Sequence, residues 1–136
     1  MVILNPSSVM LGGAALAGVE SIAVNRTADK VVVEHSDLGP FVALVDVPER
    51  RVTIVLRRRV DQDEPPPARP GDSVALTFRS GESVAAASMR QYTANVVVTA
   101  VEHRIESARA VSQTITMIAW STDGASEPLS ESVLAG

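Results

Sequence analysis

Residues 41–60 read FVALVDVPERRVTIVLRRRV, and we expect the rest of the chain to be organised around this stretch. Two runs rich in β-branched and apolar residues, Phe41–Val45 and Val52–Val60, flank the segment Asp46-Val47-Pro48-Glu49-Arg50. A proline and three charged residues in so short a segment are typical of a turn. The stretch therefore predicts a long antiparallel hairpin with its turn at residues 46–50.

The second run has the period of two that a half-buried strand requires. Val52, Ile54 and Leu56 fall on one face, and Thr53 and Val55 fall on the other, together with Arg51, Arg57 and Arg59. Arg58 breaks this pattern because it falls on the apolar side, and burying an unpaired guanidinium is costly. We therefore expect this end of the strand to leave the core and project towards solvent or another subunit.

Composition limits the function. The chain has 136 residues, which favours a single domain covering 1–136 with a core of its own. It has no cysteine, and its two histidines, His35 and His103, are isolated on β-type runs, so we expect neither a metal site nor a cofactor. The opening Met1–Leu4 lacks a basic region and is followed by Asn5-Pro6, which predicts no signal peptide.

Charge and hydropathy add further limits. No apolar run approaches the roughly 20 residues of a membrane span, so we expect no membrane insertion and a soluble protein made and used in the cytoplasm. The net charge of −4 argues against general nucleic-acid binding. Aromatic residues make up only 3% of the chain while valine, alanine and threonine are plentiful, which favours β-sheet over stacking platforms for bases.

The remaining pattern predicts an all-β, mainly antiparallel fold. Short alternating runs indicate a two-sheet β-sandwich or a strongly curved barrel with long projecting hairpins. The expected strands lie within Ser7–Leu16 with a turn at Gly12-Gly13, then Val19–Asn25, Lys30–His35, Ser73–Arg79, Tyr92–Arg104 and Ala110–Ser121, with a turn at Thr27–Asp29. Glu82–Gln91 is predicted to form the one short helix, Asp61–Asp72 an exposed loop stiffened by three prolines, and the tail from about Ala125 to be loose.

No motif points to an enzyme. There is no Gly-x-Ser-x-Gly elbow, phosphate loop or dinucleotide fingerprint. Asp61, Asp63 and Glu64 carry the oxygens that Mg²⁺ or Ca²⁺ would need, but no glycine-bearing calcium loop surrounds them, which favours a solvated acidic loop. The Arg57–Arg59 run could bind phosphate, yet the acids that follow favour ion pairs within or between subunits. The candidate subunit or ring interface is therefore Arg50, Arg51, Arg57, Arg58, Arg59, Asp61, Asp63 and Glu64.

Several pieces of sequence, in their order along Gly18–Ala125, resemble the tail tube proteins of bacteriophages. They are a Gly18-Val19-x-Ser21-Ile22 strand, Asp46-Val-Pro-Glu-Arg-Arg51-Val-Thr inside a long hairpin, Pro70-Gly-Asp72 before a strand, Val96-Val-Val-Thr-Ala-Val-Glu-His103, Thr114-Ile-Thr-Met-Ile-Ala-Trp-Ser121 and Asp123-Gly124-Ala125. The resemblance also extends to the tubes of contractile injection systems and type VI secretion.

The resemblance implies a β-sandwich subunit with one short helix. Such subunits form hexameric rings whose strands join into a continuous barrel, and the rings stack into a tube that conducts DNA. The implied partners are further copies of the chain, baseplate, tail terminator and tape measure proteins, and passing viral DNA; the implied location is the virion tail, assembled in the bacterial host. Because the lumen in this family tends to be acidic, we expect Arg57 and Arg59 to face away from it.

Two alternatives remain. The first is a nucleic-acid-binding β-barrel that uses a phosphate track formed by Arg50, Arg51, Arg57, Arg58, Arg59 and Arg69. Its DNA affinity would fall steeply with salt, because phosphate contacts release counterions. The second is a baseplate, distal-tail or tail-end protein of the same fold, which forms one ring and does not polymerise.

Overall fold

The computed structural model describes residues 2–4, 6–60, 67–80, 90–105 and 111–133. These residues form an all-β fold in which every strand pairing is antiparallel. The strands are β1 (Val2–Leu4), β2 (Ser7–Leu11), β3 (Ala14–Ala15), β4 (Val19–His35), β5 (Val42–Val60), β6 (Ser73–Arg79), β7 (Arg90–Ile105), β8 (Val111–Trp120) and β9 (Leu129–Val133).

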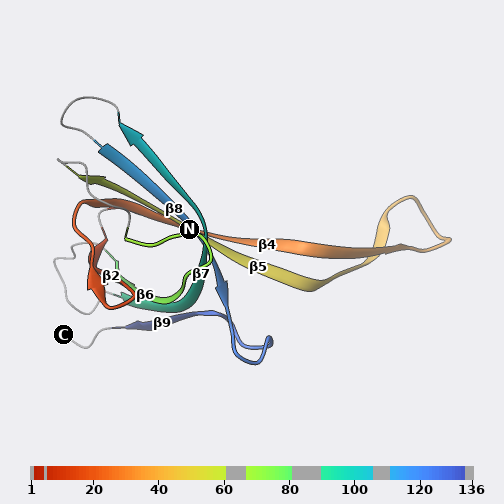
Figure 1. Cartoon of the computed structure of the whole chain (residues 1–136). Helices are drawn as coiled ribbons and strands as arrows, with labels where there is room; N and C mark the ends of the chain where they lie inside the picture. The colour runs from red at the N-terminus through yellow and green to blue at the C-terminus, as the bar shows by residue number, and fades with distance from the viewer. Residues whose placement is uncertain (1, 5, 61–66, 81–89, 106–110, 134–136) are drawn as a thin grey trace.

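All of these strands belong to a single sheet that curls into a half-barrel (Figure 1). The order across the sheet is β1-β4-β5-β8-β7-β6-β2-β3, and β9 pairs with β7 beyond the end of β8. The sequence predicted either a sandwich or a strongly curved arrangement. The described strands form one strongly curved sheet.

The core lies on one face of this curled sheet. Strands β4, β5, β7 and β8 each present alternate apolar side chains to it, as their period of two requires. Among the largest fully buried side chains are Phe78, Ile22, Ile54, Leu56 and Ile115. The rings of Phe78 and Tyr92, from the neighbouring strands β6 and β7, stack with their centroids 5.0 Å apart. The curl brings these faces together into one cluster.

The predicted hairpin within residues 41–60 is wrong. Phe41–Val45 and Val52–Val60 do not pair with each other, because Val42–Val60 is one continuous strand, β5, of 19 residues. Its partner is β4, which is likewise continuous through the turn predicted at Thr27–Asp29. Beyond the sheet the two strands continue as a two-stranded ribbon, which Figure 1 shows projecting far from the half-barrel. We call residues 26–51, which include this ribbon and its tip, the arm.

The two mistaken turns lie opposite each other in the arm. Ala28 pairs with Arg50, Lys30 with Glu49 and Val32 with Asp46, and the register shifts twice across these pairs. Turn-forming residues are tolerated there as β-bulges, which insert unpaired residues and twist a ribbon without ending it. Pro48 lies between Asp46 and Glu49, which both pair with β4, and among the described strands only β4 pairs with this part of β5, so the missing N–H of Pro48 leaves the ladder nearly intact.

The expectation that the Arg57–Val60 end of the strand projects is also wrong. This end pairs with β8 from Arg57 opposite Thr114 to Val60 opposite Val111, and both Arg58 and Val60 are buried. The opposite end of the same strand, in the arm, is the one that leaves the core. A neighbouring strand on each side keeps Arg58 inside the sheet, which the pattern of a single strand could not reveal.

Other elements follow the sequence closely. The prediction of a strand at Ser73–Arg79 is confirmed by β6, and the Gly12-Gly13 turn joins β2 and β3 as expected. The predicted pair Tyr92–Arg104 and Ala110–Ser121 is confirmed as β7 and β8. The predicted helix falls mainly on residues 82–89, outside the described residues, and its last two residues, Arg90 and Gln91, begin β7.

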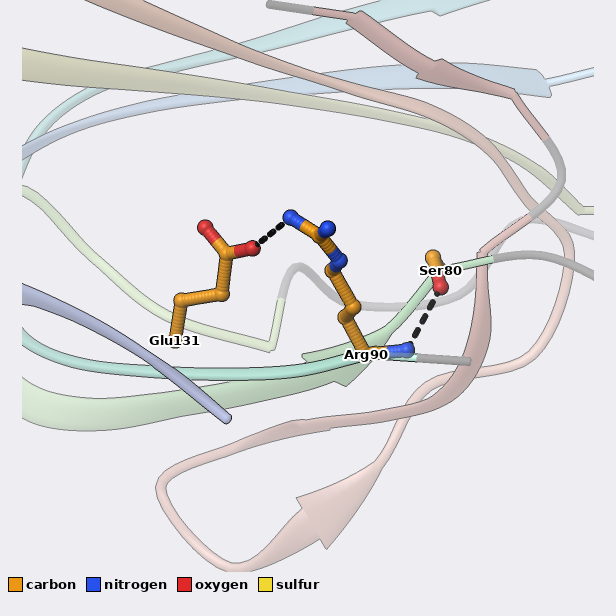
Figure 2. A network of polar contacts seen from close by, with 3 residues as sticks. All are labelled: Ser80, Arg90 and Glu131. Carbon is orange, nitrogen blue, oxygen red and sulfur yellow. Dashed lines mark hydrogen bonds and ion pairs between the residues drawn. The ribbon is translucent and has the colours of Figure 1, made fainter. Parts of the chain in front are cut away.

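Part of the segment from Ala125, expected to be loose, forms β9. Strand β8 pairs with β7 only as far as Trp120, which lies opposite Asn95. Residues Arg90–Ala94 of β7 therefore extend beyond β8, and β9 pairs with them. Figure 2 shows the polar contacts at this end: Arg90 and Glu131 form an ion pair, and the Arg90 amide donates a hydrogen bond to Ser80 Oγ at 2.9 Å. These contacts tie β6, β7 and β9 together.

Candidate functional site

The arm exposes apolar side chains that have no core of their own. Leu38 and Phe41 at its tip are 97% and 85% exposed, and apolar residues continue along both strands. The others exposed in the same way are Val31, Val32, Val33, Val42, Leu44 and Val45. An isolated two-stranded ribbon is at best marginally stable in water, and contiguous exposed apolar surface marks an interaction site.

The pairing register gives the distal arm two different faces. Val32 lies opposite Asp46 and Glu34 opposite Leu44, so carboxylates and apolar side chains alternate on one face, which we call the mixed face. Val33 lies opposite Val45 on the other face, which is apolar. Residues 31–47 contain three acidic residues and no lysine or arginine, so the distal arm is both apolar and negatively charged.

The base of the arm contacts the loop that connects β8 to β9. Arg26 Nε lies 2.8 Å from Glu127 Oε1, and within the arm Arg51 Nε lies 3.0 Å from Asp29 Oδ2. A groove of about 680 Å³ runs between the arm and this loop, with half-exposed Trp120 in its wall. The base is therefore polar and held by ion pairs, unlike the distal arm.

Asp123 shapes this connecting loop. Its Oδ1 accepts hydrogen bonds from the backbone N–H groups of Ser126 and Ala125, both at 2.9 Å, and its Oδ2 accepts one from Ser126 Oγ at 2.7 Å. The bonds from Ser126 and Ala125 favour the charged carboxylate, and they hold the pKa of Asp123 well below its ordinary value. These hydrogen bonds therefore hold the loop more strongly when Asp123 is ionised.

A second charged feature lies at the end of β5 that is remote from the arm. It is a pocket of about 350 Å³, which we call the arginine pocket, and its charged lining residues are Glu20, Arg57, Arg58, Arg59, Glu102 and Arg104. Ser112 on β8 pairs with Arg59 on one side and Arg104 on the other, and Thr114 likewise lies between Arg57 and Glu102. The pocket is thus built on four adjacent strands, β4, β5, β8 and β7.

A bulge in β7 places two of these residues. The register between β7 and β8 shifts after Val98, and the Thr99 hydroxyl donates a hydrogen bond to the Thr116 carbonyl at 3.1 Å. Val98 is buried, so without the shift Glu102 and Arg104 would lie on the core face; with it they share the outer face with Arg57 and Arg59. The sequence alternation assigned Ala100 to the face of Val98 and therefore missed these residues.

Among the described residues, the exposed arginines of the pocket differ in their ion pairs. Glu20 Oε1 lies 3.8 Å from Arg59 Nε, and Glu102 Oε1 lies 3.5 Å from Arg104 Nη2, all with exposed side chains. Within the described part of the chain, no ion pair forms on Arg57. The outer face therefore offers exposed guanidinium groups, which bind carboxylates or phosphates in a planar, bidentate way.

Arg58 has a different role. It is only 5% exposed and lies on the core face, where its Nε donates a hydrogen bond to the Ala17 carbonyl at 3.2 Å. Across the sheet it lies opposite the fully buried Gln113, whose Nε2 is 3.4 Å from His103 Nδ1. This polar row lies at the end of the core. Arg58 therefore borders the arginine pocket as a buried structural residue and is not one of the exposed arginines of the outer face.

The structure separates the predicted interface residues into groups. Arg57 and Arg59 share the outer face, Arg58 points to the core, and Arg50 and Arg51 lie in the arm. Asp61, Asp63 and Glu64 lie outside the described residues. The sequence did not single out Glu20, Glu102 and Arg104. Glu102 and Arg104 join Arg57 and Arg59 through pairing with β8, and Glu20 joins them from the register shift at the start of β4.

The next findings concern metal binding, membrane-spanning helices and similarity to known proteins. In the described ranges, no three His, Cys, Asp or Glu residues come close enough to hold a metal ion. The same ranges contain no helix that is long and apolar enough to cross a membrane. Comparison of the chain with protein-family models and with curated proteins finds no match.

Proposed function

We propose that this chain is a self-assembling structural subunit of a tube of the phage tail tube type. The observation that carries the proposal is the arm, which extends two continuous strands beyond the sheet and exposes apolar side chains on both faces. Ten residues of β5 beyond the sheet, Val42–Arg51, span roughly 33 Å at about 3.3 Å per residue. Such a ribbon gains its stability by packing against another molecule.

Open sheet edges support assembly between copies of the chain. Of the described strands only β4 pairs with Val42–Arg51, and only β8 pairs with Ala100–Ile105 of β7. Unpaired edges of this length either are blunted or pair with another chain. In the proposed ring, strands of neighbouring subunits pair through such edges and form a continuous barrel around a lumen.

The resemblance supplies the rest of the proposal. Hexameric rings stack into a hollow tube in the virion tail, with baseplate, tail terminator and tape measure proteins as further partners. Viral DNA passes through without sequence-specific binding, and Arg57 and Arg59 face away from the lumen. Repeated cations along a conduit would otherwise hold the DNA by accumulated phosphate attraction.

The arrangement of arginines weighs against the phosphate-track alternative. Arg58 is buried, and Arg51, which shares the face of Arg57, is six residues away, roughly 20 Å along the strand, and pairs with Asp29. A continuous track would need these guanidinium groups on one surface. The six arginines instead divide among the arm, the core, the outer face and the segment before β6.

Negative-stain electron microscopy of the purified full-length chain tests the proposal. We expect rings or tubes, and we expect them to disappear when Val31, Val33 and Val45 are replaced by threonine, which keeps β-propensity and removes apolar surface. Single rings that never lengthen would favour the baseplate or tail-end alternative. A chain that stays monomeric at high concentration and binds DNA with a steep salt dependence would favour the nucleic-acid-binding alternative.

The structure of the assembly supplies a second test. We expect a strand ladder between neighbouring subunits. Neighbours that met only through side chains would remove the continuous barrel from the proposal.

A further inference from the structure

The arm and the arginine pocket lie at opposite ends of the same strand. The arm contains the first ten residues of β5, Val42–Arg51, whereas Arg57 and Arg59 lie near its last residue, Val60. Figure 1 shows the arm leaving the half-barrel on the side away from the end of β5. One copy of the chain therefore carries two separate surfaces, facing opposite ways along its longest strand.

These two surfaces have complementary charge. The distal arm, residues 31–47, has acidic residues and no lysine or arginine. The outer face of the pocket has Arg57, Arg59 and Arg104 against Glu20 and Glu102, and the described residues provide no ion pair for Arg57. A carboxylate brought to this face would give Arg57 a charge-assisted partner and would add to the negative charge around Arg59.

The spacing of the two acids on the arm also matches the spacing of the two arginines in the pocket. Glu34 and Asp46 occupy diagonal positions on the mixed face, which places the two residues roughly 7–8 Å apart. Arg57 and Arg59 are two residues apart on one face of β5, a separation of about 7 Å. Beside the two acids, Val32 and Leu44 would lie over the aliphatic stems of the arginines, as such stems commonly cover apolar surface.

We propose that the mixed face of the arm docks into the arginine pocket of a second copy, with Glu34 and Asp46 of one copy paired to Arg57 and Arg59 of the next. This inference rests on the proposed function and specifies which surfaces of the subunit meet. The contact is heterologous, because two different surfaces meet. Copies joined this way follow one another head to tail and form a ring or an open filament, and do not form a closed two-fold dimer.

A charge-swap experiment on the full-length chain tests this contact. The pocket variant is R57E/R59E and the arm variant is E34R/D46R. Each variant alone brings like charges together, which disfavours association strongly, so we expect its critical concentration for assembly to rise by at least about tenfold. A 1:1 mixture restores opposite charges at every contact, and we expect it to assemble within about threefold of the wild-type concentration.

Matched controls separate charge from position. R69E changes an exposed arginine outside the pocket, and D37R changes an acid at the arm tip outside the mixed face; we expect both to assemble as the wild type does. Circular dichroism and thermal unfolding of each variant confirm that it is folded. Sedimentation of polymers and electron microscopy measure assembly.

Several outcomes would overturn the inference. They are normal assembly by either double variant, a 1:1 mixture that stays monomeric, and rescue of R57E/R59E by D61R/D63R/E64R in place of the arm variant. The last result would assign the partner carboxylates to residues 61–64 and not to the arm. A wild-type chain that never assembles would remove the proposed function as well, whereas wild-type tubes that ignore all these charges would remove only this contact.

Discussion

The Arg59 amide donates a hydrogen bond of 2.8 Å to the Gly18 carbonyl, and the Arg59 carbonyl lies 2.0 Å from the position that a Cβ on Gly18 would occupy. Gly18 has a φ of +72°, in the left-handed region. It precedes β4 where the register against β5 shifts, so this contact fixes how β4 enters the sheet and where Glu20 meets Arg59.

Gly18→Ala should therefore destabilise the fold by about 2–4 kcal/mol, because a methyl group must displace the β5 backbone as well as adopt a strained φ. Gly13→Ala is the matched control. Its φ is +85° but the space around it is open, so it should cost only about 1 kcal/mol. Urea unfolding measures both, and equal losses would mean that the contact with Arg59 is irrelevant to stability.

Arg58→Ala should be far more damaging than Arg57→Ala. The first removes a buried side chain and leaves the Ala17 carbonyl without its hydrogen bond, which should cost about 2–3 kcal/mol. The second changes an exposed residue and should stay within about 0.5 kcal/mol. The midpoint of chemical denaturation distinguishes them, and similar midpoints would contradict the assignment of Arg58 to the core.

Leu129→Ala tests whether β9 belongs to the folded subunit. Leu129 is buried in the core cluster and pairs with Ala94, so its truncation should cost about 2–4 kcal/mol. Ser130→Ala, the next residue and exposed, should be nearly neutral. Hydrogen exchange of the monomer should also show protected amides in β9. Rapid exchange there, together with a neutral Leu129→Ala, would instead support a loose tail.

Acid should loosen the loop between β8 and β9 through Asp123. Its pKa is lowered in the folded state by the amides of Ser126 and Ala125 and by the Ser126 hydroxyl, so its stabilising contribution is fully present above the pKa of the unfolded chain. The contribution is lost as pH falls towards the lower folded pKa. The stability difference between wild type and Asp123→Ala should thus shrink in acid, and a difference that grows there would contradict this sign.

The all-β class and several strands could be predicted from the amino-acid pattern. Period-two alternation fixed β6, β7 and β8 because each has a half-buried surface, and glycines marked the turn between β2 and β3. The runs Lys30–His35 and Phe41–Val45 were recognised as β-forming. The local pattern could not show that each of these runs is continuous with a neighbouring run in a single long strand, because β-bulges and turns contain similar residues.

The positions of the charged side chains depend on how the strands pair in the folded chain. The cost of burying Arg58 argued for a projecting strand end, yet strands on both sides and the Ala17 carbonyl keep this residue in the core. The arginine pocket arises because the bulge at Thr99 turns Glu102 and Arg104 to the face of Arg57 and Arg59. A register shift of one residue reverses which face each side chain occupies, and it is set by pairing between strands and not by any one of them.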